Sequence, residues 1–189
     1  MRKLIGISGK IGCGKTTLSK QFTGNGYKRI AFGDLLKRKA AERFCFPVEY
    51  CYNENDKQQE IFHPDLQKQP TSVRRILQNY GQQKRNEKPN YWVHALYVEM
   101  LCHPLHTNFI IDDVRYPNEA RLIRDHGGIL IRLEPYPGWV AGKNSTHESE
   151  TALDNWLDWD LTFTPIYQAD FTNIANIIND HLVMHYGNR

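Results

Sequence analysis

The sequence predicts an α/β fold with a mostly parallel sheet of five strands. Apolar, strand-like runs alternate with segments of helical periodicity along the 189 residues. This alternation favours parallel strands that are joined by crossover helices. The run NFIIDDV at residues 108–114 has a continuous apolar core and ends in two acids, which is typical of an interior strand in such a sheet.

Each expected element has a local reason. Strands are expected at the apolar runs 3–7, 27–33, 108–114, 129–134 and 159–163. Helices are expected at residues 16–24, 35–44, 73–86, 90–101, 117–128, 148–155 and 170–184. Asp34 is a good N-cap for the second of these helices, and Thr71 or Ser72 for the third. The helix expected at residues 117–128 is marked by proline at its start and glycine at its end.

The chain is expected to form a single domain over residues 1–189 with two additions. Residues 45–70 are polar and aromatic without a clear period. They are interpreted as an insertion with at most one short helix, around residues 56–62. Residues 135–147 are punctuated by proline and glycine, and they are interpreted as a lid-like segment.

Composition excludes several classes of protein. The 24 basic and 21 acidic residues give a net charge of +3, which is too weak to argue for a nucleic-acid partner. No apolar run approaches the ~20 residues that a membrane span needs, and no signal peptide is recognised.

The four cysteines form no C-x-x-C pair, so reduced thiols in a cytoplasmic protein are the simplest interpretation. A zinc site of Cys45, Cys51 and His63 is disfavoured because the spacing fits no established pattern.

The residues directly after the first strand carry the strongest signal. Gly9, four residues and then Gly14-Lys15-Thr16 match G-x-x-x-x-G-K-[ST] between an apolar run and a helix. Glycine permits positive φ and close approach of the backbone, so N–H groups can converge on an anion at the helix N-terminus. Lys15 suits β- and γ-phosphates, and the Thr16 hydroxyl suits Mg²⁺. A glycine-rich turn with an incidental Lys and Thr is the weaker alternative.

Acidic side chains follow other strands at the same edge of the expected sheet. Ligands of parallel sheets bind beyond the carboxyl ends of the strands. We therefore expect Asp34, Asp112, Asp113 and Arg115 to lie near the phosphate loop. One of the two adjacent acids is expected to serve a metal or a polar substrate group, and capping of the next helix is the alternative. Arg115 can pair with a carboxylate or reach a phosphate.

Cationic side chains outside the loop are candidate phosphate ligands. Arg74 and Arg75 stand in the first turn of an expected helix, where they oppose the helix dipole. Contact with a substrate phosphate therefore explains the presence of these two arginines better than helix stability does. For Lys37 and Arg38, two interpretations have equal weight: contact with a phosphate, or a place on a solvated face of the helix. Trp92 is interpreted as core packing, with stacking on a base as the alternative.

Several segments together resemble one known family. SGKIGCGKTT, SVRRILQNYG followed by NYWV, IIDDVRYPNEA with GGILIR, and HESE occur in this order in phage-type deoxynucleoside monophosphate kinases of the P-loop kinase superfamily. The resemblance covers residues 3–24, 71–98, 108–134 and 147–164. It implies a P-loop NTPase fold of three layers, α/β/α, like that of nucleoside monophosphate kinases with a small lid. The insertion at 45–70 would then lie on the substrate side, and the role of HESE is left open.

The resemblance also implies roles for individual residues. The loop that binds the ATP phosphates is matched by Lys10, Gly12, Gly14, Lys15, Thr16 and Thr17. The positions that bind the nucleotide monophosphate are matched by Lys37, Arg74, Arg75, Gly81, Trp92, Asp113, Arg115 and Glu119. Lys15, Arg75 and Arg115 are expected to act in catalysis. Thr16 is expected to bind Mg²⁺, together with Asp112 or Asp113.

The implied activity is transfer of the γ-phosphoryl group of Mg-ATP to a deoxynucleoside monophosphate. ATP and Mg²⁺ are the expected cofactors, and no nucleic acid or membrane partner is expected, while a homodimer is left open. The expected location is the cytoplasm, of the host cell if a phage encodes the chain. Two alternatives remain. One is another small-molecule P-loop kinase similar to phosphomevalonate kinase, and the other is a nucleotide-gated binding module without catalysis.

Overall fold

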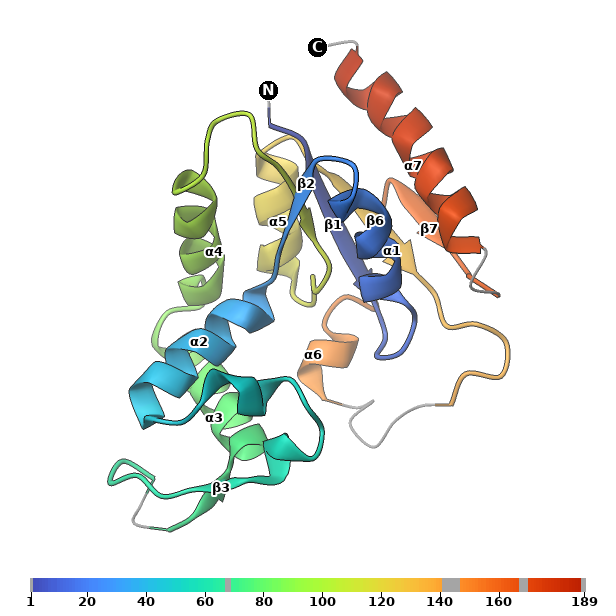
Figure 1. Cartoon of the computed structure of the whole chain (residues 1–189). Coiled ribbons are helices and arrows are strands. Elements are labelled where there is room, and N and C mark those ends of the chain that lie inside the picture. Colours follow the sequence, from blue (N-terminus) through green and yellow to red (C-terminus); the bar gives the residue numbers. More distant parts are fainter. Residues whose placement is uncertain (1, 67–68, 141–146, 167–169, 188–189) are drawn as a thin grey trace. The chain divides into compact units, whose positions relative to one another are not determined.

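The chain forms two compact units in the computed structural model, which describes residues 2–66, 69–140, 147–166 and 170–187 (Figure 1). The first unit consists of Met1–Ala31 and Met100–Arg189. The second consists of Phe32–Glu99. The expectation of a single domain over the whole chain stays a prediction.

A parallel sheet of five strands forms the centre of the first unit (Figure 1). Its strands, in spatial order, are β2 (Tyr27–Ile30), β5 (Asn108–Ile111), β1 (Leu4–Gly9), β6 (Ile129–Leu133) and β7 (Leu161–Phe163). All neighbouring pairs are parallel, and Ile5 of β1 pairs with Ile110 on one side and Ile129 on the other. The expected fold class is therefore confirmed. The loop that follows β1 leaves from the middle strand of the sheet.

Helices cover both faces of this sheet. The helices of the first unit are α1 (Lys15–Thr23), α5 (Pro117–Asp125), α6 (Glu148–Thr151) and α7 (Asp170–Gly187). Because side chains alternate along a strand, Ile5 and Ile7 join a core with residues of α1 and α7. Gly6 faces the opposite side, where an added Cβ would lie 2.3 Å from Cδ1 of Ile123 in α5. This arrangement gives the three expected layers.

The second unit is built from helices and a small antiparallel sheet. Its elements are α2 (Phe32–Phe44), the 3-10 helices η1 (Val48–Cys51) and η2 (Asp56–Gln58), β3 (Glu60–Ile61), β4 (Thr71–Ser72), α3 (Val73–Glu87) and, apart from its last two residues, α4 (Tyr91–Leu101). The expectation of at most one short helix in residues 45–70 is wrong. Two 3-10 turns and the pairing of β3 with β4 give this polar segment backbone partners that need no helical period.

One of the two expected N-caps is confirmed. Ser72 caps α3, because its Oγ accepts a hydrogen bond from the backbone N–H of Arg75 at 3.4 Å. Asp34 does not cap α2, since the helix begins at Phe32 and Asp34 lies in its first turn. There the carboxylate is still favourable to the helix dipole, and it accepts a hydrogen bond from Nζ of Lys37 at 3.1 Å. Because α2 starts earlier than expected, β2 is also shorter than expected.

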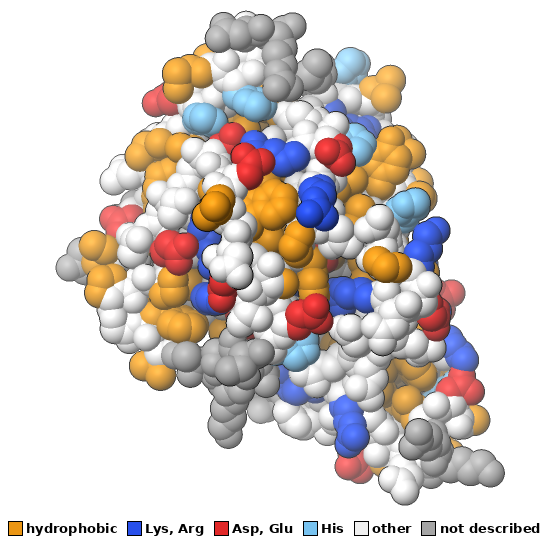
Figure 2. All heavy atoms as spheres, turned by 180° about the vertical axis from the view of Figure 1, so that it is seen from behind, with side chains coloured by type: hydrophobic (Ala, Val, Ile, Leu, Met, Phe, Trp, Pro, Cys, Tyr) orange, Lys and Arg blue, Asp and Glu red, His pale blue; other side chains and the backbone are white. Residues whose placement is uncertain are grey.

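The surface mixes charges of both signs. On the face drawn in Figure 2, lysine and arginine side chains are interspersed with aspartate and glutamate. This distribution agrees with the small net charge of +3. Among the described residues, no helix combines the length and the apolar character that crossing a membrane requires.

Candidate functional site

The loop between β1 and α1 has the backbone that its glycines predict. Gly9, Gly12 and Gly14 have φ angles of 153°, 82° and 85°, a region that side chains disfavour. Gly14 is the N-cap of α1, so the unpaired N–H groups of the first helical turn face the loop. A Cβ at Gly14 would lie 2.2 Å from Cζ of Phe171, so only glycine fits beside this ring of α7. The loop is thereby shaped to receive an anion.

Lys15 begins α1, and its ammonium group turns back over the loop. Nζ donates hydrogen bonds to the carbonyl oxygens of Gly9 and Lys10, both at 2.7 Å. Burial, and then the guanidinium of Arg115, lower the pKa of Lys15 to about 8, although Glu150 and Asp112 oppose this shift. Two neighbouring cations in a partly buried place favour an anionic ligand.

The hydroxyl-bearing residues of the motif follow directly on the helix. Thr16 is exposed and Thr17 is half-buried in the first turn of α1. Both therefore stand at the end of the helix that faces the loop. Lys10 donates to the carbonyl of Glu150 and to Oδ1 of Asp154, both at 2.5 Å, and its expected contact with ATP phosphates stays a prediction.

The two acids that follow β5 differ in their surroundings. β5 is the parallel neighbour of β1, so its carboxyl end lies at the same edge of the sheet as the phosphate loop. Asp112 is 2% exposed, and its Oδ2 accepts a hydrogen bond from Nε of Arg29 at 2.8 Å. Its Oδ1 is buried with no hydrogen-bond partner among the described residues, whereas Asp113 is half-buried. An unpaired carboxylate oxygen at this edge fits Mg²⁺, which prefers oxygen ligands.

Arg115 is held by acidic residues from two elements. Its guanidinium pairs with the carboxylate of Glu150, and its backbone N–H donates to Oε2 of Glu119 at 2.8 Å. The same oxygen of Glu119 accepts the N–H of Tyr116 at 3.1 Å, and the side chain is buried. Glu119 therefore fixes the turn between β5 and α5. Its expected contact with a nucleotide stays a prediction.

The HESE segment, residues 147–150, contacts the phosphate loop. Glu150 lies on the short helix α6, and its side chain is 6% exposed. Its Oε2 accepts a hydrogen bond from the backbone N–H of Ile11 at 2.9 Å, while Oε1 accepts a hydrogen bond from the guanidinium of Arg115. One buried carboxylate thus joins the loop to the turn after β5. Sequence reasoning did not assign Glu150 to the site.

The expected lid at 135–147 is described only in part, because residues 141–146 lie outside the described residues. Trp139, in the described part, donates a hydrogen bond from Nε1 to the carbonyl of Ile11 at 2.9 Å. A Cβ at Gly12 would lie 3.6 Å from the same Nε1. An indole ring that sequence reasoning did not single out therefore lies beside the phosphate loop.

The second unit holds the other residues that were expected to bind the acceptor. Arg74 pairs with Glu54, and Nζ of Lys37 lies 4.2 Å from the ring centre of Tyr52. These contacts engage both cations within the unit. Whether they also reach a phosphate stays a prediction.

Trp92 and Gly81 are joined in the interior of the second unit. The side chain of Trp92 is 2% exposed, and its Nε1 donates to the carbonyl of Gly81 at 3.2 Å. The ring packs edge-on against Tyr80, with ring centres 6.1 Å apart. This burial agrees with the core-packing interpretation of Trp92, and its contact with a base stays a prediction.

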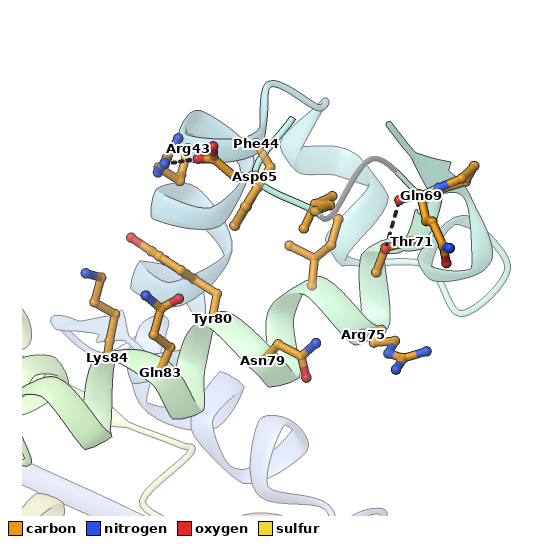
Figure 3. Close-up of a pocket in the computed structure, with 13 residues that line it drawn as sticks. Arg43, Phe44, Asp65, Gln69, Thr71, Arg75, Asn79, Tyr80, Gln83 and Lys84 are labelled. Carbon is orange, nitrogen blue, oxygen red and sulfur yellow. Dashed lines mark hydrogen bonds and ion pairs between the residues drawn. The ribbon is translucent and has the colours of Figure 1, made fainter. Parts of the chain in front are cut away.

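A cavity of about 790 Å³ opens within the second unit (Figure 3). Its lining combines two aromatic rings with three amides, one acid and three cations: Arg43, Phe44, Asp65, Leu66, Gln69, Pro70, Thr71, Arg75, Ile76, Asn79, Tyr80, Gln83 and Lys84. Arg43 pairs with Asp65 across one side of it. Of the residues expected to bind the acceptor in this unit, Arg75 lines the cavity, whereas Lys37, Arg74, Gly81 and Trp92 do not.

Comparisons with known proteins agree with the expected resemblance. No family model matches the chain. A protein of Acanthamoeba polyphaga mimivirus named "Putative deoxynucleotide monophosphate kinase" is 28% identical over 171 residues, which cover 84% of this chain and 86% of the viral protein. The solved structure of dephospho-CoA kinase from Campylobacter jejuni aligns over 100% of both chains with a TM-score of 0.54 and 13% identity. The chain therefore has the α/β fold of a P-loop kinase, and it is similar along most of its length to a viral protein named as a deoxynucleotide monophosphate kinase.

Proposed function

We propose that this chain is a deoxynucleoside monophosphate kinase that converts Mg-ATP and a dNMP into ADP and a dNDP. The observation that carries the proposal is the phosphate loop at the carboxyl edge of the sheet, where Lys15, Arg115 and the unpaired Oδ1 of Asp112 gather. The similarity to the viral protein supports the choice of acceptor. We further propose that the two units together make one kinase domain.

The donor nucleotide is proposed to bind through its phosphates. The backbone N–H groups of the loop and of the first turn of α1 surround the β- and γ-phosphates, and Lys15 exchanges its carbonyl partners for phosphate oxygens. Thr16 and Asp112 would hold Mg²⁺. When bound, this ion neutralises charge on the phosphates and on the transferred group.

The acceptor is proposed to react through an oxygen of its own phosphate. This oxygen attacks the γ-phosphorus in line, and the bond to the β–γ bridging oxygen breaks to release ADP. The attacking oxygen is already ionised, so catalysis needs positioning and charge neutralisation rather than a strong base. The cations proposed for this role are Lys37, Arg74, Arg75 and Arg115.

The part of the chain around Trp139 is proposed to limit access of water to the loop. Water is an alternative acceptor for the phosphoryl group, so its exclusion protects ATP from hydrolysis. The indole of Trp139 already lies against the loop through its hydrogen bond to Ile11. The described part of the expected lid, residues 135–140, would close further when both nucleotides are bound.

A screen of acceptors tests the function directly. The purified chain is incubated with Mg-ATP and dTMP, dGMP, dCMP, hydroxymethylated dCMP or phosphomevalonate, and the release of ADP is measured. We expect one or more deoxynucleoside monophosphates to stimulate ADP release. Lys15→Ala should lose roughly 2–4 kcal/mol of transition-state stabilisation, as for other single electrostatic contacts. Lys20→Ala is the matched control, because this exposed lysine lies on the same helix.

The other outcomes distinguish the alternatives. Stimulation by phosphomevalonate alone would reassign the chain to another class of P-loop kinase. Tight ATP binding without ADP release for any acceptor would favour a nucleotide-gated binding module. Unchanged turnover in Lys15→Ala would remove the loop from the mechanism.

A further inference from the structure

Three metal-ligating side chains gather in the first unit apart from the phosphate loop. One carboxylate oxygen of Asp160 and one ring nitrogen each of His181 and His185 lie within 4.8 Å of one another. The histidines stand one helical turn apart on α7, and their rings are stacked with centres 6.2 Å apart. Asp160 directly precedes β7. The cluster therefore joins the last helix to the start of an edge strand.

One ring nitrogen of this cluster has no hydrogen-bond partner among the described residues. Oδ1 of Asp160 lies 3.9 Å from Nε2 of His181, beyond hydrogen-bond distance. Nε2 of His181 is buried, and no residue in the described part of the chain gives it a hydrogen bond. A buried ring nitrogen without a partner is costly unless something binds there. An ion between this nitrogen and the carboxylate oxygen that faces it would satisfy the nitrogen.

Asp160 and His185 also have hydrogen-bond or ion-pair partners elsewhere in the first unit. Oδ2 of Asp160 accepts the N–H of Leu130 at 2.6 Å and lies 2.7 Å from Nη1 of Arg124. Nε2 of His185 is 3.0 Å from the carbonyl of Gly127, and donation to it leaves Nδ1 with its lone pair. Metal-binding histidines and carboxylates are commonly oriented in this way, by a backbone carbonyl or a hydrogen-bond donor on the atom that does not bind the metal. The ion pair with Arg124 is made by Oδ2 of Asp160, so it does not involve Oδ1.

We propose that Asp160, His181 and His185 bind a divalent transition metal ion of the zinc class, with water in the fourth position. Two imidazoles and one carboxylate are ligands that zinc accepts, while Mg²⁺ prefers oxygen alone. The site differs from the proposed Mg²⁺ site, because Asp160 precedes β7 and Gly127 precedes β6, whereas the phosphate loop follows β1. In a parallel sheet the proposed zinc site therefore lies at the amino ends of the strands, and the phosphate loop lies at their carboxyl ends. The ion would tie α7 to the sheet and would stabilise the fold rather than take part in catalysis.

Titration of the whole chain with zinc tests the site. The protein is first freed of metal by a chelator, and Zn²⁺ binding is then measured by isothermal titration calorimetry. We expect one ion per chain, and at least a tenfold loss of affinity in His181→Ala and in His185→Ala, since even partners outside the ligand set contribute about 10- to 100-fold. His106→Ala is the matched control, because this histidine is exposed and lies outside the cluster.

Two further measurements keep the test decisive if a variant folds poorly. The visible spectrum of wild-type protein loaded with Co²⁺ should show nitrogen and oxygen ligation without thiolate bands, which matters because the chain has four free cysteines. Zinc should also raise the melting temperature of the wild type but not of the two variants. Absence of stoichiometric binding, thiolate bands, or equal affinity in wild type and both variants would each overturn the proposal.

Discussion

Glu150 pairs with Arg115 while the same carboxylate accepts the backbone N–H of Ile11. The side chain is buried at 6% exposure, so this contact is not a loose surface ion pair. It joins the phosphate loop to the arginine that follows β5. Nη1 of Arg115 also donates to the carbonyl of Ser149 at 3.3 Å, so two residues of the HESE segment hold Arg115 beside the loop.

Glu150→Ala should lower kcat of the proposed kinase reaction by roughly 10- to 100-fold, because a misplaced catalytic group costs rate steeply. Glu150→Asp should restore part of the loss. Steady-state kinetics with the best acceptor from the screen measure the effect. Glu148→Ala is the control on the same helix, since Glu148 is exposed. Equal activity of the two alanine variants would show that Glu150 does not position Arg115.

Binding of ATP at pH 8 should take up about half a proton per chain through Lys15. The pKa of this lysine is lowered from 10.5 to about 8, so half of the ammonium groups are deprotonated at that pH before phosphates raise the pKa again. Calorimetry in buffers with different ionisation enthalpies counts the protons. Uptake should vanish at pH 6 and in Lys15→Met. Uptake that persists in Lys15→Met would assign the proton to another group.

The same shift predicts the direction of a stability change. Between pH 8 and 10.5 the unfolded chain binds more protons at Lys15 than the folded chain does. The free energy of unfolding of the nucleotide-free wild type, measured against that of Lys15→Met, should therefore rise with pH across this window. Denaturant titrations at several pH values provide the comparison, and a difference that falls with pH would contradict the assignment.

Asp112→Asn should raise the Mg²⁺ concentration for half-maximal activity at least about tenfold, and Asp113→Asn should raise it less. The reason is that the buried Oδ1 of Asp112 has no hydrogen-bond partner within the described ranges, and an amide is a weaker metal ligand than a carboxylate. Activity is measured across a magnesium series at saturating nucleotide. A larger effect from Asp113→Asn would reverse the assignment of the two acids.

Trp92→Phe should lower the free energy of unfolding by about 1–3 kcal/mol, because the carbonyl of Gly81 loses a buried donor. The KM for the acceptor should stay within about twofold, since the ring is almost fully buried. Chemical denaturation and acceptor kinetics on the same sample separate the two effects. A raised KM at unchanged stability would support the alternative that Trp92 stacks on a base.

Periodicity predicted the regular elements well because they are set by local patterns. The strands β1, β5 and β6 are continuous apolar runs, and parallel strands buried on both faces have this composition. The insertion was harder to predict. The short strand β3 is defined by its pairing with β4, a contact between distant residues that no local period reveals. The start of α2 was missed because Asp34 suits both an N-cap and a first turn.

The backbone conformation of the loop between β1 and α1 was predictable because it needs glycine at fixed positions, while phosphate binding by its residues stays a prediction. The surroundings of the loop were not predictable in the same way. Glu150 and Trp139 reach the loop from distant parts of the chain, and neither has a spacing that marks it. The difference between Asp112 and Asp113 arises from burial, which follows from the fold as a whole.

The close packing of Phe171 on Gly14 makes the last helix a structural support of the loop, although α7 carries none of the residues proposed to bind nucleotide. A shortened chain that lacked this helix would leave one wall of the loop bare and would uncover the apolar side of α1. The proposed binding of ATP would then be lost together with the fold. Substitutions throughout α7 that disturb this support should therefore look like active-site defects in a genetic screen.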